Sequence, residues 1–290
     1  MNGMAELSLF FLKKLPAGLA FHKRLRDDKG TMKELLNLKP QKSAVFGDRV
    51  LFCTGLLLLC MELWKQLYLY FAVFGEHYQV WYLPWQLCSM PMYLCLLYGI
   101  HGAHPDQHRR KQKNAKTKMS PADDVRIPGR KEYARAEERK RIIATFLADY
   151  GFLGGVAALI VHTGFTFPAH PLLTLHGYLW HVILIFLALF ITKNRLSDTK
   201  KTGFLKTLPL FAAAAAVAEG LNLLLHSFGD CDMFYISPYH LSSQPVFSDI
   251  DRLIGRIPGI FCYLACVILG AFFVHLLLGR LQRTLWLPKG

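Results

Sequence analysis

The chain has 290 residues, of which 53% are hydrophobic, and its 34 Lys and Arg against 20 Asp and Glu give a formal net charge of +14. The apolar residues occur in blocks and the charges lie between them. This pattern excludes a disordered chain and argues against a soluble nucleic-acid-binding protein in spite of the positive charge. We therefore expect a polytopic membrane protein whose partners are membrane lipids and not nucleic acid.

Six segments are predicted to cross the membrane as helices, because a spanning helix needs about 20 mostly apolar residues. A helix is the expected form, since it satisfies its own backbone polar groups where no water is present. We expect an all-α protein with these six transmembrane helices in one bundle. The predicted spans are 50–74, 80–102, 142–162, 172–192, 204–227 and 257–279.

Lys and Arg indicate the orientation of these spans, because cytoplasmic loops of membrane proteins are enriched in both. On one side lie 31 of the 34, in the N-terminal region, the second and fourth linkers and the tail. Arg252 and Arg256 alone lie on the opposite side, and Lys65 lies within the first span. Both termini are therefore predicted to be cytoplasmic. We expect a multi-pass protein of a bacterial plasma membrane.

The polar regions divide the chain further. Residues 1–49 are predicted to form a cytoplasmic or interfacial amphipathic segment, on the anionic inner leaflet. Residues 50–279 form the six-helix domain, with a basic cytoplasmic insert at 103–141, and residues 280–290 form a cytoplasmic tail. The seven cysteines predict no disulfide framework, since six of them lie in spans and no CxxC occurs. No cofactor is expected, and the oligomeric state is left open.

Three helices are predicted to bring polar side chains to a similar depth. At about 1.5 Å of rise per residue, Cys88, His181 and Glu219 lie about 12 to 14 Å below the outer boundary. Ionisable groups inside spans are costly and are therefore functional candidates. Helical spacing places Asn222 on the face of Glu219 and Tyr178 on the face of His181. Pro91, three residues after Cys88, is expected to free the Leu87 carbonyl beside the thiol.

Each of these residues also has a structural interpretation. Cys88 alone is well explained as a buried, inert thiol, and His181 as a core histidine bonded across helices. Glu62 and Lys65 are spaced to neutralise each other on the first span. No basic residue is predicted at the level of Asp149 on the third span. The matched depth of three independent segments is what favours a functional site.

Short motifs resemble the YwaF-like family of integral membrane proteins over about 50–279, outside the basic insert. The motifs are LPWQLCS at 83–89, HGYLWHV at 176–182, and EGLNLL at 219–224 followed by DMFY at 232–235. Gln86 stands where that family commonly has a histidine. The family is similar to eukaryotic transmembrane protein 164, an acyltransferase-like protein, and more distantly to the six-helix androgen-induced lipid hydrolases. The resemblance implies that Cys88 and His181 are a catalytic pair.

A lipid acyltransferase or lipid esterase is the first functional hypothesis. His181 would take the proton of Cys88, and the thiolate would attack an ester carbonyl. Glu219 or Asn222 would orient His181. The candidate donors to the oxyanion are Gln86, Ser89 and Tyr178.

A non-catalytic transporter or binding protein for a small polar ligand is the second hypothesis, in which the same residues line a cavity. A zinc site at Cys88, His181 and Glu219 is weaker still, because no tight ligand spacing occurs. The last linker, 228–256, is expected to form a lid whose Arg252 and Arg256 bind a lipid phosphate. The alternative is that these arginines pair with Asp249 and Asp251.

Overall fold

The computed structural model describes residues 42–102 and 130–285. Residues 1–41 of the predicted amphipathic N-terminal segment, residues 103–129 of the insert and residues 286–290 of the tail lie outside the described residues. The chain divides into one unit from Met1 to Ser43 and a second from Ala44 to Gly290. In the second unit, the described residues form helices joined by loops and no strand.

Within residues 42–102 and 130–285, five helices are long and apolar enough to cross a membrane, which confirms an integral, multi-pass membrane protein. Each apolar run coincides with one of the predicted spans. The five helices carry large apolar side chains on their outer surfaces, such as Leu224, Phe261 and Phe273, each at least two-thirds exposed. Exposed apolar surface of this extent is expected where helices face lipid. The helices are α3 (Lys42–Tyr68), α6 (Arg130–Ile160), α7 (Pro171–Lys193), α9 (Leu208–Leu225) and α11 (Arg256–Leu285).

The predicted span 80–102 is not one continuous helix. It begins with the short turns η2 (Val80–Tyr82) and η3 (Leu87–Ser89), and only then continues as α4 (Met90–Gly102), which has 13 residues. A helix of that length is about 20 Å long and is too short to cross the apolar core alone. Pro91 lies in the first turn of α4, where its missing N–H costs no hydrogen bond. The Leu87 carbonyl, expected to be free, accepts the N–H of Met90.

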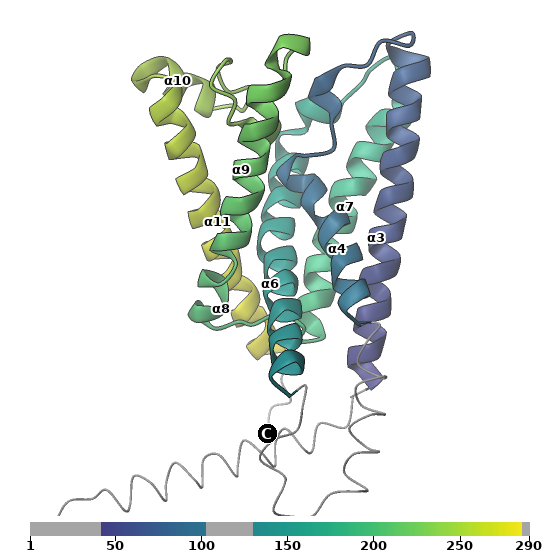
Figure 1. Cartoon of the computed structure of the whole chain (residues 1–290), viewed down its shortest axis with the longest axis vertical. Helices are drawn as coiled ribbons and strands as arrows, with labels where there is room; N and C mark the ends of the chain where they lie inside the picture. Colours follow the sequence, from purple (N-terminus) through teal and green to yellow (C-terminus); the bar gives the residue numbers. More distant parts are fainter. Residues whose placement is uncertain (1–41, 103–129, 286–290) are drawn as a thin grey trace, which may run out of the picture. The chain divides into compact units, whose positions relative to one another are not determined.

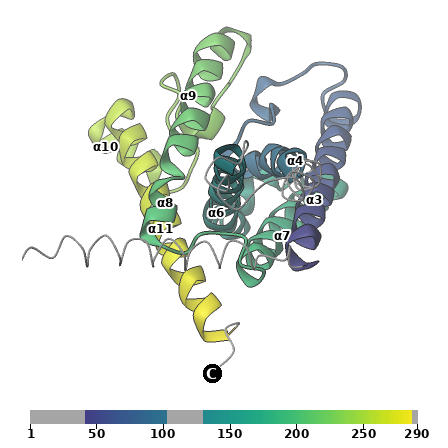
Figure 2. The same cartoon turned by 60° about the horizontal axis from the view of Figure 1, so that its bottom comes forward.

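Helix α6 is the central element of the described bundle. It contacts α4, α7 and α11, as well as the short helix α8 (Lys201–Leu205). Figures 1 and 2 both show α3, α4 and α7 on one side of α6, and α9 and α11 on the other. The loops that join η2 to α4 and α9 to α11 gather at one end of the bundle, whereas α8 lies at the other (Figure 1).

Buried charged side chains join these helices. Asp149 of α6, for which no basic partner was expected, pairs with His275 of α11 at 2.9 Å, and the other ring nitrogen of His275 is 3.0 Å from the Lys200 carbonyl oxygen. Near the end of the bundle that holds α8, Lys140 of α6 binds Asp48 of α3 at 2.7 Å. Such pairs link α6 to the helices on both of its sides.

Candidate functional site

Cys88 lies in the turn η3, where irregular backbone meets the start of α4. Its side chain is partly buried, and the neighbouring Ser89 is buried. The carbonyl oxygen of Cys88 accepts a hydrogen bond from the indole N–H of Trp180, at 3.0 Å. Trp180 is the residue before His181 on α7, so this bond attaches the turn that carries Cys88 to the turn that carries His181.

His181 is buried, with 6% of its surface exposed, and its ring is held from two directions. Nδ1 lies 2.7 Å from the carbonyl oxygen of Gly177, one turn earlier in α7. Because a carbonyl can only accept, Nδ1 must carry the proton, and Nε2 of the neutral ring is left with its lone pair. The ring also stacks on Phe165, with centroids 4.8 Å apart. This arrangement leaves Nε2 as a base.

Gly177 contributes to this arrangement through its lack of a side chain. A Cβ placed there would overlap the ring of Phe165, the same ring that stacks on His181. Gly177 therefore allows the ring of Phe165, which lies in the loop 161–170, to pack against α7. Gly177 thus helps to orient His181 in two ways: its carbonyl oxygen contacts Nδ1, and its missing side chain leaves room for the Phe165 ring that stacks on His181.

The residues expected to orient His181 have other partners. Asn222 is fully buried, and its side-chain amide binds the backbone of Met233 through both atoms, at 2.6 and 3.2 Å. Glu219 lies 3.4 Å from the same amide. The Gly177 carbonyl occupies the orienting position that the sequence had suggested for these two residues. Their shared helical face is real, but it is turned toward the loop 226–255.

Of the three candidate oxyanion donors, two have other contacts. The amide of Gln86 donates to the Asp232 carbonyl at 3.0 Å and accepts from the Phe234 N–H at 2.8 Å. Tyr178 is 38% exposed and packs edge-on against Phe165 at 5.1 Å. Ser89 remains next to the thiol, and its side chain acts on Cys88.

Two charged residues near Cys88 and His181 were interpreted from the sequence as a local ion pair. Glu62 and Lys65 do pair, at 2.8 Å, as expected. The charge of Lys65 also acts on both Cys88 and His181, across three helices. His176, only 9% exposed, lies with Nε2 3.2 Å from the Met61 carbonyl oxygen and stacks on Trp64. The signal in the sequence was a cation within a predicted span, which is rare without a function.

The described residues show neither a direct hydrogen bond between Cys88 and His181 nor a cluster of metal ligands. No direct hydrogen bond joins Cys88 to His181, and their backbones are joined through Trp180. Within the same residues, no group of three His, Cys, Asp or Glu side chains converges as a metal site would require. The zinc alternative at Cys88, His181 and Glu219 therefore lacks a ligand cluster in the part of the chain that was described.

The two arginines of the last linker have different surroundings. Arg252, in α10 (Phe247–Ile254), is exposed and pairs with Asp249 at 3.1 Å. The side chain of Arg256 is only 9% exposed, and its guanidinium donates to Asp251 at 2.7 Å, to the Ser237 carbonyl and to the Tyr235 carbonyl.

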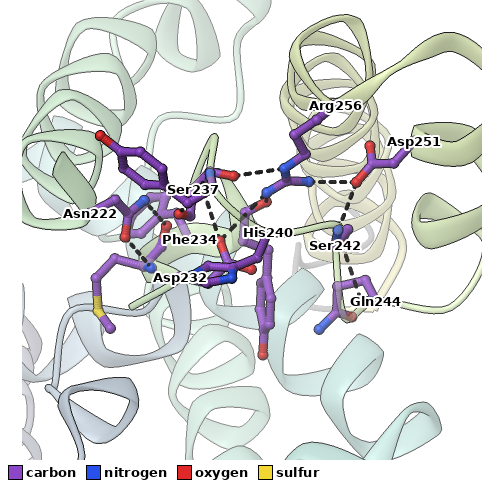
Figure 3. A network of polar contacts seen from close by, with 12 residues as sticks. Asn222, Asp232, Phe234, Ser237, His240, Ser242, Gln244, Asp251 and Arg256 are labelled. Carbon is purple, nitrogen blue, oxygen red and sulfur yellow. Dashed lines mark hydrogen bonds and ion pairs between the residues drawn. The ribbon is translucent and has the colours of Figure 1, made fainter. Parts of the chain in front are cut away.

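Figure 3 shows Arg256 as the centre of this polar network. The guanidinium is thus used to fold the loop rather than left open to a lipid phosphate. The alternative pairing, with Asp249 and Asp251, is the one that the structure has.

A comparison with protein families supports the membrane architecture. The model of the TMEM164 family matches residues 18–277, and the chain belongs to that family. A search among curated proteins found no significant match, and a search among solved structures found none either. The match covers Cys88, His181 and the loop between α9 and α11.

Proposed function

We propose that this protein is a membrane-embedded acyltransferase or esterase of lipids that uses Cys88 as nucleophile and His181 as base. The observation that carries the proposal is the hydrogen bond from Trp180 to the Cys88 carbonyl, because it attaches the two turns that bear these side chains. The donor role of His181 Nδ1 toward Gly177 supports it, since Nε2 is then ready to accept a proton.

The proposed reaction has two steps, acylation of Cys88 and its deacylation. His181 Nε2 takes the thiol proton, Cys88 sulfur attacks the ester carbonyl, and the alcohol of the lysolipid leaves with the proton returned from His181. An acceptor alcohol or water then loses its proton to His181 and attacks the thioester carbonyl, the carbon–sulfur bond breaks, and His181 returns the proton to the Cys88 thiolate. Water gives hydrolysis, and an alcohol gives acyl transfer.

Lys65 lies close enough to act electrostatically on both Cys88 and His181. Glu62 holds Lys65 at 2.8 Å and is itself 3% exposed. Ser89, next to the nucleophile, is the side chain best placed to donate to the oxyanion.

A cysteine-reactive probe with an acyl chain tests the proposal. We expect labelling of the wild-type protein in membranes and its loss in Cys88→Ala. Cys95→Ala is the matched control, because Cys95 is a fully buried thiol two turns later, on α4. Equal labelling of Cys88→Ala and wild type would reject the nucleophile.

A non-catalytic binding protein for a small polar ligand is the second candidate, and one observation favours it. Cys88 and His181 share no direct hydrogen bond among the described residues, and a cavity-lining role needs none. Absence of labelling at Cys88 in the folded wild-type protein would favour this candidate over the enzyme.

A further inference from the structure

A pocket opens at the end of the bundle where the loops gather, apart from Cys88. Its volume is about 510 Å³, and it lies between the segment 78–81 and the segment 228–243. No lysine or arginine is among the residues that line it, whereas two aspartates are. Its main side chains are Tyr78, Trp81, Phe228, Asp230, Asp232 and His240.

Two polar atoms in this pocket lack a hydrogen-bond partner within the described part of the chain. Asp232 is 2% exposed, and its Oδ2 is buried with no partner, as is Nε2 of His240. The other carboxylate oxygen, Oδ1, accepts the N–H of Ser237 at 2.8 Å and lies 3.5 Å from Arg256. The network in Figure 3 therefore holds one side of the carboxylate and leaves the other unused.

A buried polar group without a hydrogen-bond partner is costly, and the cost is greater for a charged carboxylate. Burial also raises the pKa of Asp232 to about 6, which is the response of a carboxylate that lacks enough positive charge or hydrogen-bond donors around it. His240 lies close enough to act on the same carboxylate. The pocket thus combines an unused acceptor, negative charge and aromatic walls.

We propose that this pocket binds an ammonium group, whose N–H donors reach Asp232 Oδ2 and His240 Nε2. Asp230, within 4.0 Å of His240 Nε2, adds a second negative charge at the rim. The rings of Tyr78, Trp81 and Phe228 suit a cation, because the faces of aromatic rings attract positive charge. An anionic ligand is disfavoured, since the guanidinium of Arg256, which lies near Asp232, is already bound by other groups of the protein.

Asp232 Oδ2 and His240 Nε2, the two atoms without a partner, favour a primary ammonium over a quaternary one. A primary ammonium has three N–H donors and satisfies both atoms, whereas a quaternary ammonium has none. The ligand is either a free amine or the headgroup of a lipid, and both present the same chemistry. The pocket is lined by neither Cys88 nor His181, so loss of the proposed reaction would leave amine binding unaffected.

Binding of 2-aminoethanol to the full chain in phosphatidylglycerol nanodiscs tests the proposal. We expect saturable binding that weakens about tenfold or more in Asp232→Asn, which keeps Oδ1 but replaces Oδ2 by an N–H donor. Asp249→Asn is the control, because Asp249 is an exposed aspartate at the same end and does not line the pocket. We also expect choline, the trimethyl analogue, to bind about tenfold more weakly.

Nanodiscs that contain a lipid with a primary amine headgroup separate the two sources. Loss of 2-aminoethanol binding in them indicates a lipid headgroup, and unchanged binding indicates a free amine. His240→Leu should show the same loss of binding and carries the test where Asp232→Asn does not fold. The proposal is overturned by no saturable binding in any nanodisc, by wild-type affinity in folded Asp232→Asn, or by choline that binds as tightly as 2-aminoethanol.

Discussion

Gln86 and Asp232 are 146 residues apart in the chain and are joined by a hydrogen bond of 3.0 Å from the Gln86 side chain to the Asp232 carbonyl. The same side chain accepts the N–H of Phe234 at 2.8 Å. Phe234 and Tyr235 both have positive φ, near 57° and 59°, which is unfavourable for residues with a side chain. Gln86, two residues before Cys88, therefore holds the strained part of the loop 226–255.

Replacement of Gln86 by Leu should destabilise the protein by about 3 kcal/mol, because two buried backbone groups lose their partner. Thermal unfolding in nanodiscs measures the effect. Gln282→Leu is the control: it removes a single hydrogen bond, to the Thr192 carbonyl, and we expect about 1 kcal/mol. A Gln86→Leu variant as stable as the wild type would show that the loop does not depend on this contact.

Arg256 and Arg252 differ in what their loss should cost. Arg256→Gln breaks a buried pair with Asp251 and leaves a charge without a partner, so we expect about 3–5 kcal/mol of destabilisation. Arg252→Gln breaks an exposed pair, and we expect less than about 1 kcal/mol. Unfolding midpoints of both variants provide the measurement. Equal effects of the two substitutions would contradict the role of Arg256 as the centre of the loop.

Asp232 should make stability depend on pH. Burial raises its pKa in the folded protein to about 6 from 3.8, so the folded state binds the proton more tightly than the unfolded state. Protonated Asp232 therefore contributes to the free energy of unfolding in full below about pH 4, and this contribution is lost as the pH rises through 6.

The unfolding midpoints of wild type and Asp232→Asn between pH 4 and 8 test this effect. The wild type should lose stability relative to the variant as the pH rises. A constant difference between the two would show that Asp232 does not titrate in this range.

Gly177→Ala should displace Phe165 from His181, because the new methyl group would overlap the Phe165 ring. We expect destabilisation of about 1–3 kcal/mol from overpacking and a fall in acyl-probe labelling at Cys88. Gly154→Ala on α6 is the control, since a Cβ there meets no atom within 4 Å. Labelling at the wild-type level in Gly177→Ala would show that the packing of Phe165 on His181 does not affect the reactivity of Cys88.

The five long helices were predictable, because each has an apolar run of spanning length with few charged residues, and hydropathy needs no knowledge of neighbours. The divided segment before α4 was harder to predict. Pro84 and Pro91 were visible, but an apolar run with prolines is compatible with either a kinked span or a loop followed by a short helix. The depth of His181 was calculated from the regular rise of α7, whereas the depth of Cys88 assumed a continuous helix from Val80, where the chain instead forms two short helical turns and a loop.

Contacts between distant side chains were beyond the sequence. The pairing of Asp149 with His275 spans 126 residues, and helical periodicity does not say which helix becomes a neighbour. The amides of Gln86 and Asn222 were identified as polar groups near the site, yet both bind loop backbone. Their partners exist only once the loop 226–255 has folded, with two residues in an unusual backbone conformation.

The acyl-enzyme itself is the most direct test of the central claim. The full chain in nanodiscs is incubated with a phospholipid of one defined acyl chain, and its peptides are then examined by mass spectrometry. We predict that Cys88 carries that acyl group as a thioester that hydroxylamine removes, that His181→Gln forms it far more slowly, and that Cys95→Ala forms it at the wild-type rate. A folded wild-type protein that turns over the lipid without any adduct at Cys88, or that forms it equally in His181→Gln, would contradict the Cys–His mechanism.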